Sequence, residues 1–188
     1  MSAYRVAVDV TFKRTGARRY STVVSDAVHG VRELDPAPGY HDDVPHDLAH
    51  YVVECELGLT DAVFGRAARG GGMFRPVPQG RRDSREERRQ ARKQRKKEDR
   101  MRDGDHSSGR EMGLSERLAG LSLVHWVRRH DPSARPPDWA PAAAELDADT
   151  SAALDRIGER LDALAPVWRE LRVGEELRFR WPSAEPIR

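Results

Sequence analysis

The sequence predicts an α+β fold, in which a small antiparallel sheet packs against three or four helices. Three observations support this prediction. Residues 4–13 alternate between hydrophobic and polar side chains, residues 177–181 do the same, and several segments between them repeat hydrophobic residues at helical spacing. Hydrophobic residues make up only 38% and charged residues 34% of the 188-residue chain. A single compact domain is therefore expected only if much of the charge lies outside its core.

The sheet is expected to begin with a β-hairpin and to end with a C-terminal strand. Hydrophobic side chains occupy every second position from Tyr4 to Phe12, a turn follows around Gly16, and the stretch YSTVV at 20–24 forms the second strand. Near the C-terminus, a further strand alternates hydrophobic residues with arginine and is stopped by Pro182. Since two strands alone are marginally stable, we expect the last strand to complete a three-stranded sheet with the hairpin. Residues 28–44 are rich in turn formers and are predicted to form a loop.

Four segments are predicted to be helical. The first runs from about Pro45 to Leu57, after a cap at Asp42 or Asp43, and the second covers residues 60–68. The third repeats leucine and valine at helical spacing from residue 114 and ends before residues 130–132. The fourth keeps a spacing of three to four from residue 154 to residue 171, with Thr150 or Ser151 as its cap and a kink at Pro166.

The charge of the chain is concentrated in one segment. Residues 81–103 contain twelve Lys or Arg and six Asp or Glu, a net charge of +6, whereas the whole chain carries +2, so the remainder sums to −4. Only Ala91 and Met101 are hydrophobic between Arg81 and Arg102, so no face of this segment can join a core. We therefore expect one folded domain made of residues 1–74 and 111–188, interrupted by a charged insertion, flexible or helical, at residues 75–110.

The composition also indicates a compartment. There is one cysteine, Cys55, so an intrachain disulfide is impossible and a reducing environment is favoured. No hydrophobic run approaches the roughly 20 residues that cross a bilayer, and the N-terminus does not resemble a signal peptide. A cytoplasmic protein without membrane contact is expected, and the excess of arginine over lysine, 29 to 4, is typical of a GC-rich bacterial genome.

The stretch VPHDLAHYVVECELG at residues 44–58 contains the candidate site. On a helix, His46, Asp47, His50 and Glu54 share about one quarter of the circumference, and hydrophobic residues occupy the opposite side. Two histidines four residues apart can place their imidazole nitrogens on one ion, and carboxylates can complete or orient such a site. The four residues are therefore candidate ligands of a divalent metal, zinc first. Alternatively, they form the polar face of an ordinary amphipathic helix.

The motif differs from the zinc-peptidase signature, because Asp47 stands where that signature has the glutamate that acts as general base. It resembles the His-Asp-x-x-His motif of the Coq4-type ubiquinone-biosynthesis family over roughly 25 residues, through the stretch LTDAVFGRAARG at residues 59–70. The resemblance implies zinc bound by His46, Asp47 and His50. That family's distal glutamate, just after a glycine, has no counterpart, because Arg66 follows Gly65; Glu54 or Glu56 would have to replace it.

Other features are weaker candidates. The glycine-rich stretch at residues 65–72 follows a helix instead of a strand, so it predicts a helix end and turn more than a phosphate loop, although Arg66 and Arg69 could face an anion. His125 could supply a third metal ligand if its helix crosses the first one. The basic segment Arg81–Arg102 contains no aromatic residue, which is typical of a solvated charged segment, with non-specific nucleic-acid contact as the alternative.

Two functions follow from these features. The first is a small metal-binding protein that could act as a metal-dependent enzyme on a small-molecule substrate. The second is a non-enzymatic binding or adaptor protein whose basic segment contacts nucleic acid or an acidic partner. The sequence identifies no reaction, no substrate and no catalytic residue.

Overall fold

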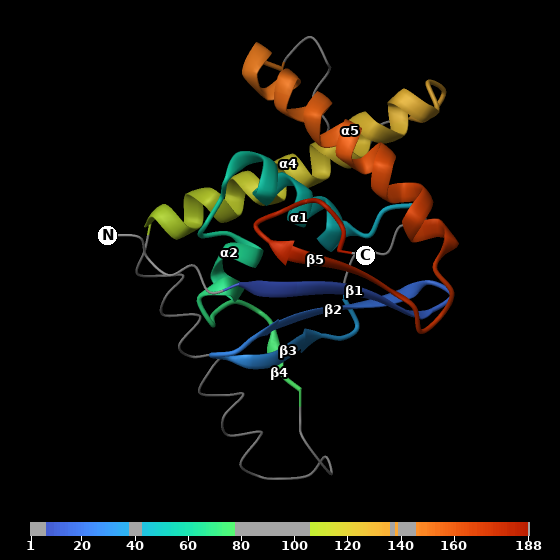
Figure 1. The fold of residues 1–188 in the computed structure, drawn as a ribbon. Helices are drawn as coiled ribbons and strands as arrows, with labels where there is room; N and C mark the ends of the chain where they lie inside the picture. Colours follow the sequence, from blue (N-terminus) through green and yellow to red (C-terminus); the bar gives the residue numbers. More distant parts are fainter. Residues whose placement is uncertain (1–6, 38–42, 78–105, 136–137, 139–145, 188) are drawn as a thin grey trace.

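A computed structural model describes residues 7–37, 43–77, 106–135, 138 and 146–187 of the protein. The predicted α+β class is confirmed. Five antiparallel strands form one sheet, and within the described residues four helices lie on one side of it (Figure 1). None of these helices has the length and hydrophobicity needed to cross a membrane. The predicted charged segment Arg81–Arg102 lies outside the described residues.

The sheet has the strand order β4-β3-β2-β1-β5. Its members are β1 (Val8–Gly16), β2 (Arg19–Asp26), β3 (Gly30–Leu34), β4 (Arg75–Pro76) and β5 (Glu176–Trp181). The hairpin and its pairing with the C-terminal strand were both predicted correctly, because Val10 lies opposite Val24 on one side and Phe179 on the other. Alternate residues of β1 and β5 are buried beneath the helices, as expected for an antiparallel sheet covered on one face.

The prediction of three strands was wrong, because β3 and β4 extend the sheet beyond the hairpin. Strand β3 lies inside the predicted loop at residues 28–44. Its buried residue is Arg32, at 4% exposure, while its neighbour Val31 is exposed. In β3 the buried position is therefore charged and the exposed position is hydrophobic, the reverse of the usual pattern, so the strand could not be recognised from hydrophobic alternation.

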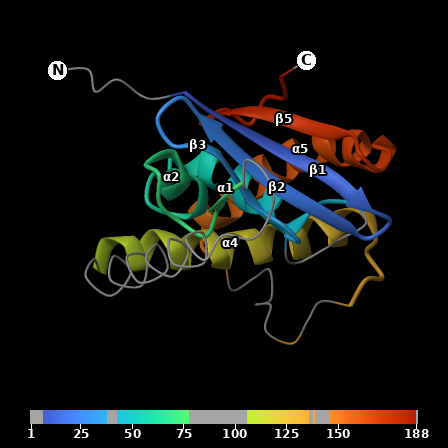
Figure 2. The same cartoon turned by 90° about the horizontal axis from the view of Figure 1, so that it is seen from below.

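The helices are α1 (His46–Leu57), α2 (Val63–Ala68), α4 (His106–His130) and α5 (Ala148–Glu170). Helix α1 packs on the sheet and is also in contact with α2, α4 and α5, so it lies near the centre of the molecule (Figures 1 and 2). Its residues Asp47 to Glu54 are all buried. The predicted end at Leu57 is confirmed, and the next residue, Gly58, has a left-handed φ of 64°, a conformation that glycine adopts without strain.

The predicted caps of two helices were not found. Pro45 occupies the N-cap of α1 without a side-chain hydrogen bond, so Asp43 does not cap it, and Asp42 lies outside the described residues. Asp147 caps α5 instead of Thr150 or Ser151, by accepting from the backbone amide of Thr150 at 2.7 Å. Pro166 lies within α5.

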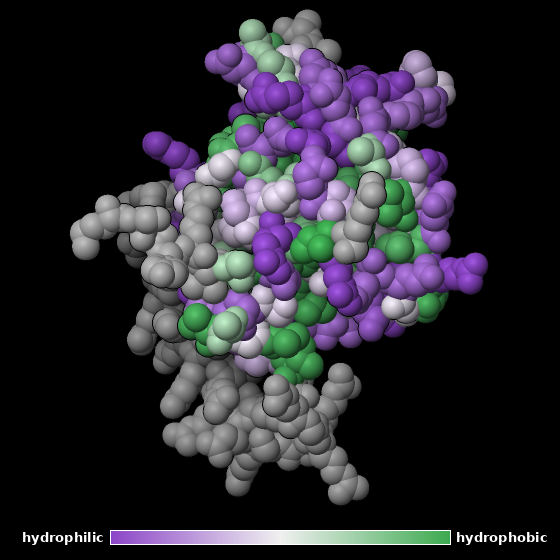
Figure 3. All heavy atoms as spheres, in the orientation of Figure 1, coloured by the Kyte–Doolittle hydropathy of each residue, from purple (hydrophilic) through white to green (hydrophobic). Residues whose placement is uncertain are grey.

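Aromatic side chains form the centre of the core between the sheet and α1. Tyr51 of α1 lies 5.8 Å from Phe12 of β1 and 4.9 Å from Phe179 of β5, measured between ring centroids. Phe64 of α2 lies 5.0 Å from the ring of Tyr51. These contacts hold α1 in a fixed rotation on the sheet, because the ring of Tyr51 packs edge-to-face against Phe12 and Phe64 and at a tilt against Phe179. On the face shown in Figure 3, hydrophilic side chains cover α5, and hydrophobic atoms appear only in separate patches.

Candidate metal centre

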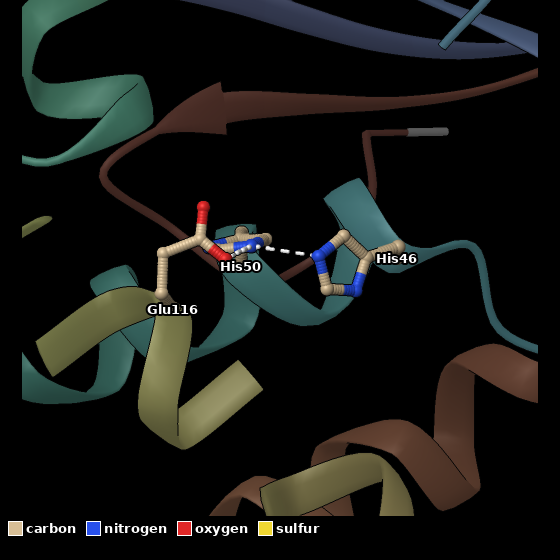
Figure 4. A group of neighbouring side chains, drawn as sticks. All are labelled: His46, His50 and Glu116. Carbon is tan, nitrogen blue, oxygen red and sulfur yellow. Dashed lines mark hydrogen bonds and ion pairs between the residues drawn. The ribbon is translucent and has the colours of Figure 1, made fainter. Parts of the chain in front are cut away.

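Two histidines of α1 and a glutamate of α4 converge at one point (Figure 4). The Nε2 atoms of His46 and His50 are 3.1 Å apart, and His50 Nε2 lies 3.5 Å from Glu116 Oε2. The ligand atoms of the three residues all lie within 4.8 Å of one another. His50 is buried, His46 is half-buried and the side chain of Glu116 is 58% exposed, so the group extends from the interior to the surface.

The two separations measured from His50 Nε2 suit a tetrahedral transition-metal ion. Zinc binds imidazole nitrogen at about 2.0–2.1 Å, so two nitrogens on one tetrahedral ion lie about 3.3 Å apart. The observed separations of 3.1 Å and 3.5 Å fall on either side of this value. A donor set of two histidines and one carboxylate would leave one tetrahedral position open.

The other ring nitrogen of His50 faces the interior. Nδ1 lies 2.8 Å from the hydroxyl of Ser115, and this hydroxyl lies 3.0 Å from Glu54 Oε1. Both Ser115 and Glu54 are fully buried. Burial, together with the nearby His46, lowers the pKa of His50 to about 3, so its ring is neutral at physiological pH, as a metal ligand must be.

Glu54 is not turned toward this group of ligand atoms. Its Oε1 accepts the backbone amide of Val63 at 2.9 Å, and its Oε2 accepts those of Phe64 and Gly65 at 2.8 and 3.3 Å. The carboxylate therefore satisfies the free amides at the start of α2, which has no side-chain cap of its own. Burial raises the pKa of Glu54 to about 7, although the amide and Ser115 hydrogen bonds act in the opposite direction.

Asp47 faces the sheet instead of α4. Its Oδ2 accepts the hydroxyl of Thr22 on β2 at 2.7 Å, and its backbone amide donates to the hydroxyl of Tyr20 at 3.3 Å. Burial raises the pKa of Asp47 above its ordinary value, and the bond from Thr22 opposes this shift. Asp47 thus connects α1 to β2 through Thr22 and Tyr20.

Of the four candidate ligands in the sequence, the structure brings together His46 and His50, and it adds Glu116. The carboxylates of Asp47 and Glu54 are instead occupied by hydrogen bonds to Thr22 and to the first amides of α2. The polar quarter of the helix is not a solvent-facing surface, because His50 is 3% exposed and Glu54 is 0% exposed. Glu116 could not be identified from the local pattern, because it depends on how α4 packs against α1.

The other candidates have ordinary partners. His125 pairs with Asp155 of α5 at 3.1 Å and is not among the converging ligands, so it does not supply the third position. Arg66 and Arg69 both pair with Asp61. The stretch at residues 65–72 forms the end of α2 and the following turn, as expected. Cys55 is half-buried, and burial raises its pKa to about 12, which makes the thiol a poor nucleophile.

Comparison with known proteins gives no independent indication of function. A scan against protein-family models finds no match, and searches of curated proteins and of solved structures find no similar chain. The function is therefore argued from the geometry of the site.

Proposed function

We propose that the protein binds one divalent transition-metal ion, zinc in the first place, through His46 Nε2, His50 Nε2 and a carboxylate oxygen of Glu116. The observation that carries the proposal is the convergence of these three atoms from two helices that are far apart in the sequence. Imidazole and carboxylate are borderline and hard ligands that suit zinc and iron more than calcium or magnesium.

Such a site would have a reactive position. Three protein ligands leave the fourth tetrahedral position to water or substrate, and a zinc ion there lowers the pKa of bound water or polarises a carbonyl group. The side chain of Glu116 is 58% exposed, which supports a position that a small molecule can reach. The site therefore favours a metal-dependent enzyme over a purely structural zinc site, which normally has four protein ligands.

The test is metal binding by the full chain. Protein purified without chelators is analysed for metal content, and the metal-free protein is titrated with Zn²⁺ and Co²⁺, the latter followed by its visible absorption. We expect one equivalent per chain for the natural sequence. His46→Ala and His50→Ala should weaken binding by about 100-fold or more, since each removes a ligand, and Glu116→Gln by about tenfold.

His125→Ala is the matched control, because His125 also carries an acidic partner on another helix but lies outside the group. It should bind metal like the natural protein. Circular dichroism of each variant checks that the fold is retained, which matters most for the buried His50. A natural protein that binds neither Zn²⁺ nor Co²⁺ would refute the proposal, as would equal affinity of the His46→Ala and His125→Ala variants.

A further inference from the structure

The two ring nitrogens of His50 face different environments. Nε2 points to His46 and Glu116, at 3.1 and 3.5 Å, toward the partly exposed side of the site. Nδ1 points to Ser115 at 2.8 Å, in the interior. A neutral imidazole carries its proton on only one nitrogen, and the hydrogen bond made by one nitrogen decides which of them is free to bind a metal.

The direction of these hydrogen bonds follows from counting donors. When Glu54 is ionised, its carboxylate has no hydrogen to give, and it already accepts three backbone amides. Ser115 must therefore donate its single hydroxyl hydrogen to Glu54 Oε1, across 3.0 Å. Its oxygen can then only accept from His50, so the proton of His50 lies on Nδ1.

We propose that Glu54 and Ser115 are positioning residues that hold His50 as the Nδ1–H tautomer and thereby present the lone pair of Nε2 to the metal position. The effect on metal affinity rests on the proposed function, whereas the tautomer itself does not. Glu54 is in turn fixed by the first amides of α2, so the orientation of a ligand on α1 depends on α2 and on α4 together. The arrangement corresponds to the carboxylate–histidine pairs found behind metal ligands, with a serine hydroxyl inserted between the two groups.

The contact between the two histidines fits the same tautomer. With Nδ1 protonated, His50 Nε2 can accept a hydrogen bond from His46 Nε2 across the observed 3.1 Å. The rings lie edge to face, with an interplanar angle of 88° and centroids 4.6 Å apart. An Nε2–H tautomer of His50 would instead leave the buried Nδ1 facing a hydroxyl with no hydrogen left to donate.

The experiment combines two measurements at pH 8, where Glu54 is predominantly ionised. First, ¹⁵N chemical shifts of the His50 ring are measured in the metal-free natural protein and in Ser115→Ala. Second, Zn²⁺ affinity is measured by competition with a chelator for both proteins. Ser122→Ala is the matched control, because Ser122 is also a buried serine of α4, but its hydroxyl donates to the backbone oxygen of Ala119 within the same helix.

We expect the proton of His50 on Nδ1 in the natural protein and in Ser122→Ala, and a mixture of tautomers in Ser115→Ala. Zn²⁺ affinity should fall about 10- to 100-fold in Ser115→Ala and stay within about twofold in Ser122→Ala. A proton on Nε2 in the natural protein would overturn the proposal whether or not Ser115→Ala folds. If the natural protein binds Zn²⁺, equal Zn²⁺ affinity of the two serine variants would overturn it as well.

The outcomes also separate this inference from the proposed function. A natural protein with Nδ1–H that binds no Zn²⁺ refutes the metal site and supports the positioning of the ring. A natural protein that binds Zn²⁺ as tightly as Ser115→Ala, with an unchanged tautomer, supports the metal site and overturns the role of Ser115 and Glu54.

Discussion

Replacement of Glu54 tests whether this residue acts mainly as the cap of α2. Its carboxylate accepts three backbone amides and one hydroxyl, and its side chain is fully buried. In Glu54→Ala these four donors lose their acceptor, and the space that the carboxylate filled becomes empty. In Glu54→Gln the shape is kept, but one acceptor oxygen becomes an NH₂ group that faces donors.

The expected loss of stability follows from the number of donors left without a partner. A buried donor that loses its acceptor costs about 1–3 kcal/mol, so the three amides alone would cost about 3–9 kcal/mol. Water entering the space offsets part of this cost, and we expect about 4 kcal/mol for Glu54→Ala. For Glu54→Gln we expect about 2 kcal/mol, because one oxygen still accepts. These losses are large compared with the 5–15 kcal/mol that holds a typical domain folded.

The assay is urea unfolding at pH 8 without metal, followed by circular dichroism and by fluorescence of the buried Trp168. Glu56→Gln is the control: the carboxylate of Glu56 pairs with Arg160 near the surface, where an ion pair contributes about 0–1 kcal/mol. If Glu54→Ala and Glu56→Gln lowered the free energy of unfolding equally, within about 0.5 kcal/mol, the capping role of Glu54 would be refuted.

Two further predictions concern the residues that pack α2 against its neighbours. Gly65→Ala should destabilise the protein by about 3 kcal/mol, because the added methyl group would overlap the backbone carbonyl of Thr60. Gly113→Ala should instead stabilise α4 by about 0.5–1 kcal/mol, because nothing among the described residues lies within 4 Å of the added methyl group. Thermal unfolding of both variants compares the signs of the two stability changes, and a neutral Gly65→Ala would contradict the close approach of Gly65 to Thr60. Asp26→Asn should cost about 3 kcal/mol at pH 7, because it leaves the buried Arg32 without its charge partner. Burial raises the pKa of Asp26, but the amides of residues 28 and 29 and the nearby charges lower it more, so the net shift is downward. This stability is therefore present above the ordinary pKa of about 3.9 and is lost as pH falls through the lower folded value. The stability difference between Asp26→Asn and the natural protein should accordingly shrink below about pH 4, and a difference that did not depend on pH would argue against the ion pair.

Much of the fold was predictable because its elements carry regular hydrophobic patterns. Strands β1 and β5 alternate with period two, β2 follows β1 after a turn, and α4 and α5 repeat hydrophobic residues at helical spacing, so local side-chain order was sufficient to locate them. Strand β3 was missed because its buried position holds Arg32, which pairs with Asp26 and donates to the backbone oxygen of Ala67. Asp26 lies on the neighbouring strand β2 and Ala67 on α2, so the burial of Arg32 depends on contacts that hydrophobic alternation within β3 does not show.

The candidate site was predictable only in part. The spacing of four residues on α1 placed His46 and His50 side by side, because that spacing alone brings two side chains to one face of any helix. The same face includes Glu54 and borders Asp47, yet the tertiary structure assigns these to the start of α2 and to Thr22. The buried amides and hydroxyl found there need acceptors, and only the packed fold brings those donors to the two carboxylates.

The sequence by itself determined the strand and helix patterns and the pair of histidines, since each depends on neighbours within one turn or one strand. Only the tertiary structure decided that Glu116 faces this pair and that Ser115 lies behind His50. Both residues belong to α4, more than sixty residues away along the chain, and their positions depend on how α4 lies against α1. Side chains brought together by helix packing leave no fixed spacing in the sequence, which is the physical reason why the third ligand and its supporting hydrogen bonds appear only in the folded protein.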